Sequence, residues 1–421
     1  MFQPFAGLPA PTRRLLFTRA ARSIGQGALT VDFALYLHAL GWSAPGIGAV
    51  LSAGSLVSAG LSLMVGWISD RWGRKPFLLV YEVIVAGAGL LAMLTSQPAL
   101  LAAAAIVGGF GRGANGSAGP FSPAEQAWLA EAISPAKRGR VYSLNTSIGF
   151  VGMGLGAVIA ALVPLWSGLL GGGAAAYRPL FAWTLAANLC NFFILRGTTG
   201  GARPATAPRR QVEQPGDERV VRTENSALFK MAFSNAINGL AIGLFGPLTS
   251  YWFSIKFGVG PEAIGPVFAL TFFMTGIASL WAGQLSERVG LVRSVMFIRF
   301  IGFLVLVALP LVPWYWLAAT LYVARSALNR GTAGPRQALI MGLVRDQRRG
   351  VATSVANAGF QLPGSVGPTL AGFMLQQGAL AMPWLLGAGL QLVYIWVYGR
   401  FFSSYDGAGK GSPTSVTAAH S

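Results

Sequence analysis

The chain has 421 residues, of which 53% are hydrophobic and only 10% are charged, and its formal net charge is +18. This composition leaves too little polar surface to cover a water-soluble globule of that length, which excludes the ordinary soluble classes of protein. We therefore expect the lipid bilayer to be the solvent of most of the chain.

Apolar runs recur along the sequence, each of about 20 residues, which is enough to cross a hydrocarbon core of about 30 Å. The first six predicted spans are 15–40, 44–65, 77–96, 99–124, 141–164 and 176–195. The second six are 228–253, 263–284, 293–312, 314–338, 351–375 and 380–402. The prolines and mixed charges between the two sets are typical of a solvated linker. The predicted organisation is a bundle at 1–195, a linker at 196–225, a second bundle at 226–402 and a polar tail at 403–421.

A short charged motif occurs once after the second predicted span and once after the eighth. The first copy reads Gly66-Trp-Ile-Ser-Asp70-Arg71-Trp-Gly73-Arg74-Lys75, and the second reads Gly283-Gln-Leu-Ser-Glu287-Arg288-Val-Gly290-Leu-Val-Arg293. Positions 66, 70, 71 and 73 recur at 283, 287, 288 and 290, a constant offset of 217. This regularity indicates that the two halves are copies of one unit, which is typical of secondary transporters.

The motif also has a physical logic. Gly66 and Gly73 permit close helix approach and a tight turn beside Asp70. Asp70 can accept hydrogen bonds from a neighbouring helix N-terminus or an arginine, so we expect it to act as a latch between bundles. The alternative for Arg71 and Arg74 is that they only anchor the loop on the cytoplasmic side.

Basic residues are concentrated on one side of the predicted membrane. Most of the 31 Lys and Arg residues fall in the termini and the even-numbered loops, and the odd-numbered loops hold almost no charge. This distribution predicts an inner or plasma membrane protein with both termini in the cytoplasm. Since the charge is explained by topology, we expect no nucleic acid partner.

Residues that would support enzymatic chemistry are scarce. A single cysteine, Cys190, excludes an internal disulfide, and two histidines make a metal site unexpected. Neither a phosphate-binding G-x-x-x-x-G-K-[ST] loop nor an H-E-x-x-H motif is present. We expect no enzymatic activity, no cofactor and no metal.

Charged residues inside predicted spans are the strongest pointers to function, because each costs about 2.5 to 3.5 kcal/mol unless it is paired or hydrated. Asp32 lies near mid-depth in the first span, Arg112 lies deep in the fourth, and Glu125 lies near the inner end of the fourth. We predict that these three residues couple transport to protons, with a static structural pair as the alternative. Glu82 and Arg299 are 217 residues apart and are interpreted as structural charges.

Polar side chains at helical spacing predict a substrate cavity. The candidates are Arg22, Gln26, Thr30, Asn115, Asn235, Asn238, Arg325 and Asn329. Stripes of this kind face a cavity more often than lipid. For the neutral members, hydrogen bonding between helices is an equally good explanation.

The segment from Gly66 to Lys75 resembles the loop 2-3 motif of the major facilitator superfamily, and Gly283 to Arg293 resembles its degenerate copy in loop 8-9. Arg112-Gly-Ala-Asn115-Gly116 is similar to the fourth-helix motif of proton-coupled members, with Asn115 where the family often has Gln. The resemblance implies an all-α membrane protein, with 12 transmembrane helices in two pseudo-symmetric six-helix bundles and a cavity lined by helices 1, 4, 7 and 10. The helix 5 motif of drug-efflux members is only partly met, because Ala157 stands in place of the proline.

These observations predict a proton-coupled carrier, a monomer in the bilayer, that exports small amphipathic organic molecules. One alternative is uptake or facilitated movement of an organic anion, which the arginine excess on the tenth span favours. Another is a non-transporting membrane receptor or scaffold.

Overall fold

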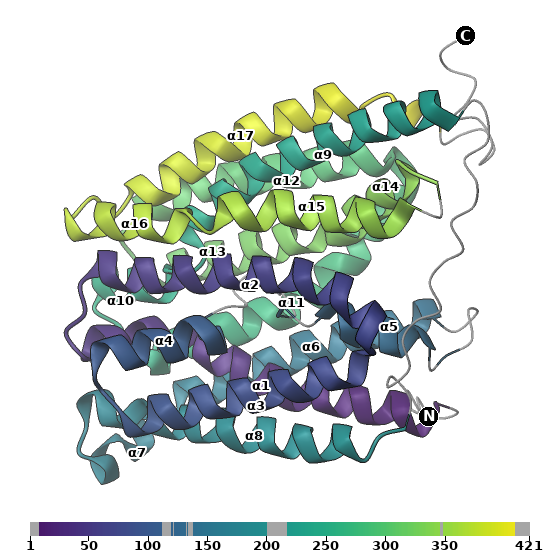
Figure 1. The fold of residues 1–421 in the computed structure, drawn as a ribbon. Coiled ribbons are helices and arrows are strands. Elements are labelled where there is room, and N and C mark those ends of the chain that lie inside the picture. Colours follow the sequence, from purple (N-terminus) through teal and green to yellow (C-terminus); the bar gives the residue numbers. More distant parts are fainter. Residues whose placement is uncertain are drawn as a thin grey trace, which may run out of the picture. The chain divides into compact units, whose positions relative to one another are not determined.

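The computed structural model describes residues 8–111, 119–120, 122–131, 133, 138–199, 217–345 and 348–408. All regular elements among these residues are helices (Figure 1). They form two compact units. Unit 1 comprises Met1–Arg210, Gly246–Phe273 and Pro368–Gly378, and unit 2 comprises Gln211–Phe245, Met274–Gly367 and Ala379–Ser421.

The helices of the first sequence half belong to unit 1. They are α1 (Ala10–Ala39), α2 (Ala44–Trp72), α3 (Arg74–Leu94), α4 (Pro98–Gly108), α5 (Ser122–Glu131), α6 (Arg138–Ala161), α7 (Val163–Leu170), η2 (Gly173–Tyr177) and α8 (Arg178–Arg196). In Figure 1, α1, α3 and α8 run alongside one another, and α1 also packs on α6.

The second half begins inside the predicted linker, because α9 already starts at Asp217. Its helices are α9 (Asp217–Phe245), α10 (Thr249–Phe257), α11 (Pro261–Val289), α12 (Leu291–Ala308), η3 (Leu309–Leu311), α13 (Tyr315–Gly331), α14 (Ala333–Gly342), α15 (Arg349–Gly364), α16 (Gly367–Gln376), α17 (Met382–Phe402) and α18 (Tyr405–Ala408). Within unit 2, α9 packs against α15 and α17, and α12 packs against α17.

Five of the twelve predicted spans each extend over two α-helices: α4 and α5, α6 and α7, α9 and α10, α13 and α14, and α15 and α16. The breaks coincide with Gly and Pro, which disfavour or cannot complete the helical hydrogen-bond ladder. Gly246-Pro247 separates α9 from α10, and Gly367-Pro368 follows the break after α15. Discontinuous helices of this kind are characteristic of transporters, where irregular backbone lines a site.

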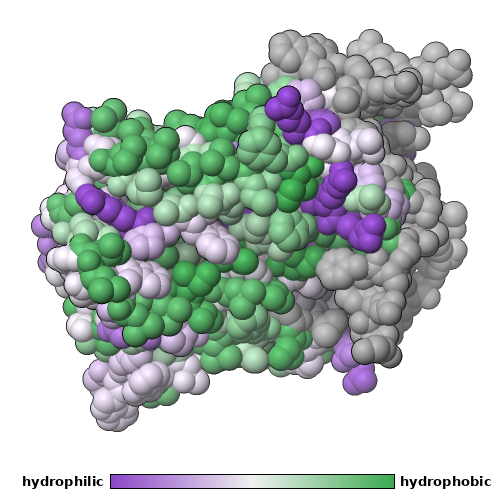
Figure 2. Space-filling view, turned by 90° about the horizontal axis from the view of Figure 1, so that it is seen from below, coloured by the Kyte–Doolittle hydropathy of each residue, from purple (hydrophilic) through white to green (hydrophobic). Residues whose placement is uncertain are grey.

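Large apolar side chains cover the outer surface, as Figure 2 shows for one face. Leu165, Leu169 and Trp316 are 75%, 88% and 74% exposed, which suits contact with lipid rather than water. Seven described helical segments are long and apolar enough to cross a membrane. They are Ala44–Val65, Arg74–Leu94, Val141–Ala161, Glu218–Phe257, Pro261–Val289, Leu291–Leu311 and Met382–Phe402.

Glycines bring α1 and α6 into backbone contact. A Cβ atom on Gly27 would strike the carbonyl oxygen of Met153, and one on Gly156 would strike that of Ile24. Unit 2 repeats the device, since a Cβ on Gly239 in α9 would strike the carbonyl oxygen of Phe360 in α15. Small residues at helix interfaces are the main source of close packing within a bilayer.

We expect Gly27→Val to destabilise unit 1, because overpacking of a tight contact costs about 1 to 3 kcal/mol. The melting temperature of the purified protein in detergent measures the loss. Gly60→Val is the matched control, since Gly60 is an exposed glycine of α2 with open space around its Cβ position. Equal melting temperatures for the two variants would contradict the assigned α1–α6 contact.

Candidate functional site

Arg22 on α1 joins two carboxylates in the interior of unit 1. Its Nη2 donates to Glu82 Oε1 on α3 over 2.5 Å, and its Nη1 donates to Glu125 Oε2 on α5 over 2.6 Å. Asn191 of α8 donates its Nδ2 to Glu82 Oε2 over 3.4 Å. The buried guanidinium therefore joins α1, α3 and α5, and α8 is linked to them through Glu82.

Arg19 completes this group, which we name the unit 1 ion cluster: Arg19, Arg22, Glu82 and Glu125. Arg19 is 5% exposed, and the charge of Glu125 acts on it. The two printed ion pairs of the cluster both belong to Arg22, and Nε and Nη1 of Arg19 have no hydrogen-bond partner among the described residues. Because charges withdrawn from water are tolerated only when they are paired and hydrogen-bonded, Arg22 is the residue that compensates the two carboxylates.

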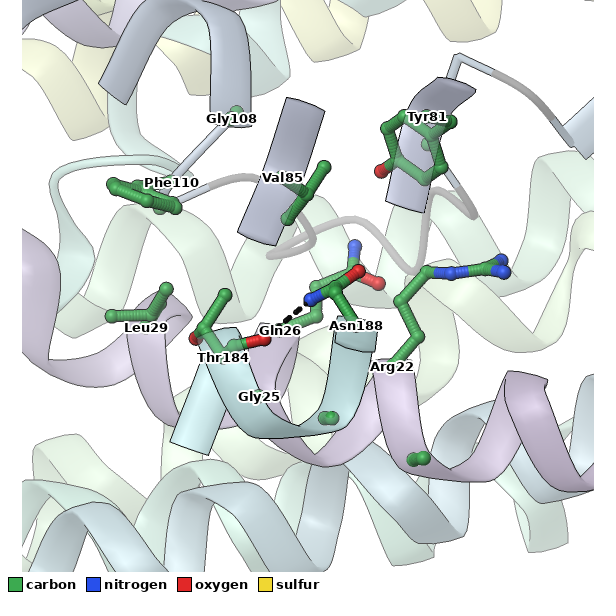
Figure 3. Close-up of a pocket in the computed structure, with 15 residues that line it drawn as sticks. Arg22, Gly25, Gln26, Leu29, Tyr81, Val85, Gly108, Phe110, Thr184 and Asn188 are labelled. Carbon is green, nitrogen blue, oxygen red and sulfur yellow. Dashed lines mark hydrogen bonds between the residues drawn. The ribbon is translucent and has the colours of Figure 1, made fainter. Parts of the chain in front are cut away.

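A small cavity of about 40 Å³, lined by both polar and apolar residues, adjoins the ion cluster. Figure 3 shows Arg22, Gln26, Tyr81, Thr184 and Asn188 around it. The dashed line marks the bond from Asn188 Nδ2 to the carbonyl oxygen of Thr184, 2.6 Å long. A cavity of this size with several polar groups in its wall admits about one to three water molecules, and it is too small for an organic substrate.

Asp32 is buried on α1 as well, nearer to the C-terminal end of the helix than Arg22. It is 1% exposed, and neither of its carboxylate oxygens has a hydrogen-bond partner among the described residues. The charge of Glu262, an exposed residue in the first turn of α11, acts on it. An ionised carboxylate in such a place is costly, and a protonated one is much less so.

Arg112 and Asn115 lie outside the described residues, so the pairing of Asp32 with Arg112 stays a prediction. The structure places Glu125, the third predicted coupling residue, in the ion cluster with Arg22.

Unit 2 also contains a buried polar centre, in which an arginine is bonded to neutral side chains and not to carboxylates. Arg299 on α12 donates its Nη1 to Asn238 Oδ1 of α9 (2.9 Å) and to Gln391 Oε1 of α17 (3.4 Å). Its Nε donates to Thr332 Oγ1 over 3.2 Å. In unit 1, an arginine on α1 meets an acid on α3; in unit 2, an arginine on α12 meets a neutral amide on α9.

Three further arginines, Arg325, Arg330 and Arg336, lie on α13 and α14. The charges of Arg299 and Arg330 act on Arg325, and that of Arg336 acts on Arg299. We name Arg299, Arg325, Arg330 and Arg336 the unit 2 arginine cluster. The 217-residue spacing of Glu82 and Arg299 in the sequence did not indicate that Arg299 would lie near three other arginines.

The predicted cavity residues of the second half are engaged in several ways. Asn235 donates to the carbonyl oxygen of Ala356 (3.0 Å) and accepts from Arg336 Nη2 (3.0 Å). With the Asn238–Arg299 bond, these are hydrogen bonds between helices, the alternative stated for the neutral residues. Asn329 is half-buried and accepts from Thr332 through its carbonyl oxygen. In the first half, Gln26 accepts from Thr30 Oγ1 through its carbonyl oxygen.

The side chains of residues 66–72, including Gly66, Asp70 and Arg71, lie outside the described part of the structure. Gly73 has φ of 90° and precedes α3, and Gly290 has φ of 102° and precedes α12. Both turns need this left-handed backbone, which favours glycine. Arg74 is half-buried in the first turn of α3, Gly283 has open space around it, and Glu287 and Arg288 are exposed.

Asp406 is a contact that the sequence did not indicate. Its Oδ1 accepts from the backbone N–H of Val292 (2.8 Å) and its Oδ2 from that of Arg293 (2.7 Å), so a residue of the predicted polar tail caps α12. A lone acid 113 residues from its partner carries no local pattern by which it could be found.

Comparison with known proteins places these features in context. A family model described as the Major Facilitator Superfamily matches residues 15–232 and 231–416. An uncharacterized membrane protein of Saccharomyces cerevisiae, YJR124C, is 22% identical over 423 residues, covering 91% of this chain and 92% of that protein. The multidrug resistance protein MdtH of Yersinia enterocolitica is 30% identical over 161 residues, covering 35% of this chain and only 38% of that protein.

Solved structures agree on the fold. The nucleoside transporter NupG has a TM-score of 0.72 at 13% identity, covering 93% of this chain and 99% of that one. A bacterial homologue of the iron transporter ferroportin has a TM-score of 0.70 at 14% identity, covering 93% and 98% of the two chains.

Proposed function

Because the chain belongs to the Major Facilitator Superfamily, we propose that it is a proton-coupled secondary transporter that exports small amphipathic organic molecules by alternating access. It is a multi-pass membrane transporter with the 12-helix fold predicted from the sequence. The proposal adds the coupling ion, the direction and the kind of cargo. It also places both termini in the cytoplasm and treats the monomer as the working form.

The single observation that carries proton coupling is the Asp32 carboxylate. It is buried and has no hydrogen-bond donor among the described residues. A carboxylate held in this way binds a proton when sealed from water and releases it when water or a cation reaches it. Alternating access changes that exposure in every cycle, so Asp32 can load a proton on one side and release it on the other.

Export is supported by the partial match to the multidrug resistance protein MdtH, which spans about a third of the chain. Amphipathic cargo agrees with the mixture of aromatic and polar residues on the helices predicted to line the cavity. Ala157 stands where drug-efflux members have a proline, and this departure counts only against export as the direction of transport.

Transport in everted membrane vesicles tests this function. A respiration-driven pH gradient is followed with a quenched acridine dye, and compounds to which a deletion strain is sensitive are added. An exported compound should partly collapse the gradient in wild-type vesicles and leave it intact in Asp32→Asn vesicles. Compound movement that is unchanged when a protonophore is added would instead support a facilitator.

A second function, uptake or facilitated movement of an organic anion, is favoured by the unit 2 arginine cluster. The direction of compound movement under an imposed pH gradient separates it from export. A receptor or scaffold would move no compound in either direction.

The loop motif provides a further prediction. We expect Asp70→Asn to leave expression intact and to lower transport at least about 10-fold, because a latch worth about 1.4 kcal/mol of state preference is lost. Glu287→Gln, in the degenerate copy, is the matched control and should have a smaller effect. Initial transport rates in vesicles measure both variants. Equal, negligible effects would remove the latch assignment.

A further inference from the structure

In unit 1, the helix that follows the first copy of the repeated motif is tied to the end of α8. Lys75, in the first turn of α3, donates its Nζ to the carbonyl oxygens of Arg196 (2.8 Å) and Thr198 (2.7 Å). Arg14 of α1 donates to the carbonyl oxygen of Gly197 over 2.5 Å. Cations at a helix C-terminus are favourable, because its last carbonyl groups carry partial negative charge. The start of α3 is thereby held at the end of α8.

Unit 2 makes the same tie with the opposite charge. Val292 lies 217 residues after Lys75, so it occupies the equivalent position, and its aliphatic side chain has no donor. Asp406, which follows α17, accepts instead from the backbone N–H groups of Val292 and Arg293, over 2.8 and 2.7 Å. An acid at a helix N-terminus is favourable, because the first N–H groups carry partial positive charge. The tie therefore recurs in both units, although different residues form it.

Gly290, the last glycine of the second motif copy, leaves room for the Asp406 side chain. A Cβ atom on Gly290 would lie 2.6 Å from Asp406 Cγ, which is too close for any side chain. Gly290 is also the N-cap residue of α12 and has no side chain with which to cap the helix itself. Tyr405 packs against Phe402, with ring centroids 6.1 Å apart, and holds the chain beyond α17 on unit 2. We name the Asp406 contact with Val292 and Arg293 the tail clasp.

The acid of the second motif copy does not form the tail clasp. Glu287 occupies the position that Asp70 has in the first copy, and its side chain is exposed. The motif predicts an acid that accepts from a helix N-terminus, and in unit 2 the acid that does so is Asp406. Since α12, α17 and Asp406 belong to the same unit, the clasp fixes loop 8-9 within unit 2.

We propose that Asp406 is a positioning residue of the transport cycle, which makes loop 8-9 move together with the end of α17. The inference rests on the proposed function, but only on alternating access, and not on the coupling ion, the cargo or the direction. Glycine permits a wide range of backbone angles, so the loop would swing about Gly290 without the clasp. In a transporter whose bundles move as nearly rigid bodies, a swinging inner loop slows the change of state. Substrate affinity is unaltered, because the clasp lies outside the predicted cavity helices.

Hydrogen exchange of the purified protein in detergent measures the clasp itself. In Asp406→Ala, the amides of Val292 and Arg293 should exchange about 2- to 30-fold faster than in wild type, the factor that corresponds to an N-cap acceptor. Asp406→Asn keeps one acceptor oxygen and should give an intermediate rate. Glu287→Gln is the matched control, because it makes the same change from carboxylate to amide at an exposed acid of the same loop. It should leave the exchange of both amides unchanged.

Transport of ethidium, a fluorescent amphipathic cation, measures the role of the clasp in the cycle. In vesicles assayed well below the melting temperature of each variant, Asp406→Ala should lower the maximal rate per folded protein about 5-fold. The half-saturating concentration should stay within about twofold, since only the change of state is slowed. Ile395→Val is the control for stability, because it deletes one buried carbon from α17 at a similar cost without touching the clasp. It should preserve the rate.

Three results would overturn the proposal: unchanged exchange in Asp406→Ala, faster exchange with an unchanged transport rate, or equal losses of rate in Asp406→Ala and Ile395→Val. The second would show that the clasp is structural only. If Asp406→Ala does not fold, the same two measurements on Asp406→Asn decide the question. A wild-type protein that moves neither ethidium nor any compound from the deletion-strain test would overturn the proposed function and the role of Asp406 in transport. The exchange rates of α12 would then still show whether the clasp forms.

Discussion

Asp32→Asn is expected to abolish uphill transport on a pH gradient while substrate exchange without a gradient survives. Asn has the size of Asp and cannot bind and release a proton, so the cycle loses its coupling but not its cavity. The expectation rests on our proposal that Asp32, which is buried and has no hydrogen-bond partner among the described residues, takes up a proton when it is sealed from water. Proteoliposomes with an imposed pH gradient measure uphill movement, and counterflow measures exchange.

Glu262→Gln is the matched control, because it makes the same chemical change at an exposed acid of unit 1 whose charge acts on Asp32. It should leave uphill transport within about twofold of wild type, since exposed charges interact weakly through water. If Asp32→Asn protein still accumulates or extrudes substrate against its gradient, Asp32 is not the coupling site. Glu125→Gln is then the next variant to measure.

Arg22→Ala is expected to cause the largest loss of stability in unit 1. Removing the guanidinium leaves Glu82 and Glu125 buried without their shared partner, and breaking a buried ion pair costs about 3 to 5 kcal/mol. We expect a lower melting temperature in detergent and a lower yield of monodisperse protein. Since the guanidinium is occupied by two carboxylates, its predicted role in substrate binding would require it to leave them.

Two variants make this result specific to the ion cluster. Arg13→Ala removes an exposed arginine from the first turn of the same helix and should change the melting temperature little. Adding Glu82→Gln and Glu125→Gln to Arg22→Ala should recover part of the loss, because uncharged amides cost less to bury than unpaired carboxylates. A triple variant as unstable as Arg22→Ala alone would show that packing, and not charge, accounts for the effect.

The sequence alone determined the class of the protein. Hydropathy depends only on residues that are neighbours in the sequence, and the 217-residue offset between the Gly66 and Gly283 motifs is a spacing along the chain. Both can therefore be obtained without coordinates. They predicted a helical membrane protein of two related halves, and this prediction is confirmed. The Gly-Pro pair at 246 and 247 was also a visible signal for the break between α9 and α10. The repeated motif cannot show what Asp70 contacts, so the latch stays a prediction.

Only the tertiary structure decided which charges meet. Arg22 was predicted to line a cavity and Glu82 to be a separate structural charge, yet they are bonded across 60 residues of sequence, and Glu125 joins them across 103. Asp406 caps α12 by accepting from the backbone N–H of Val292, 114 residues before it. Pairing of this kind depends on helix rotation and on distances between helices, which arise from packing summed over many contacts such as that of Gly27 with Met153. The sequence shows which charged residues lie in apolar spans, where burial is unfavourable, but it does not show which residue forms the ion pair that compensates each of them.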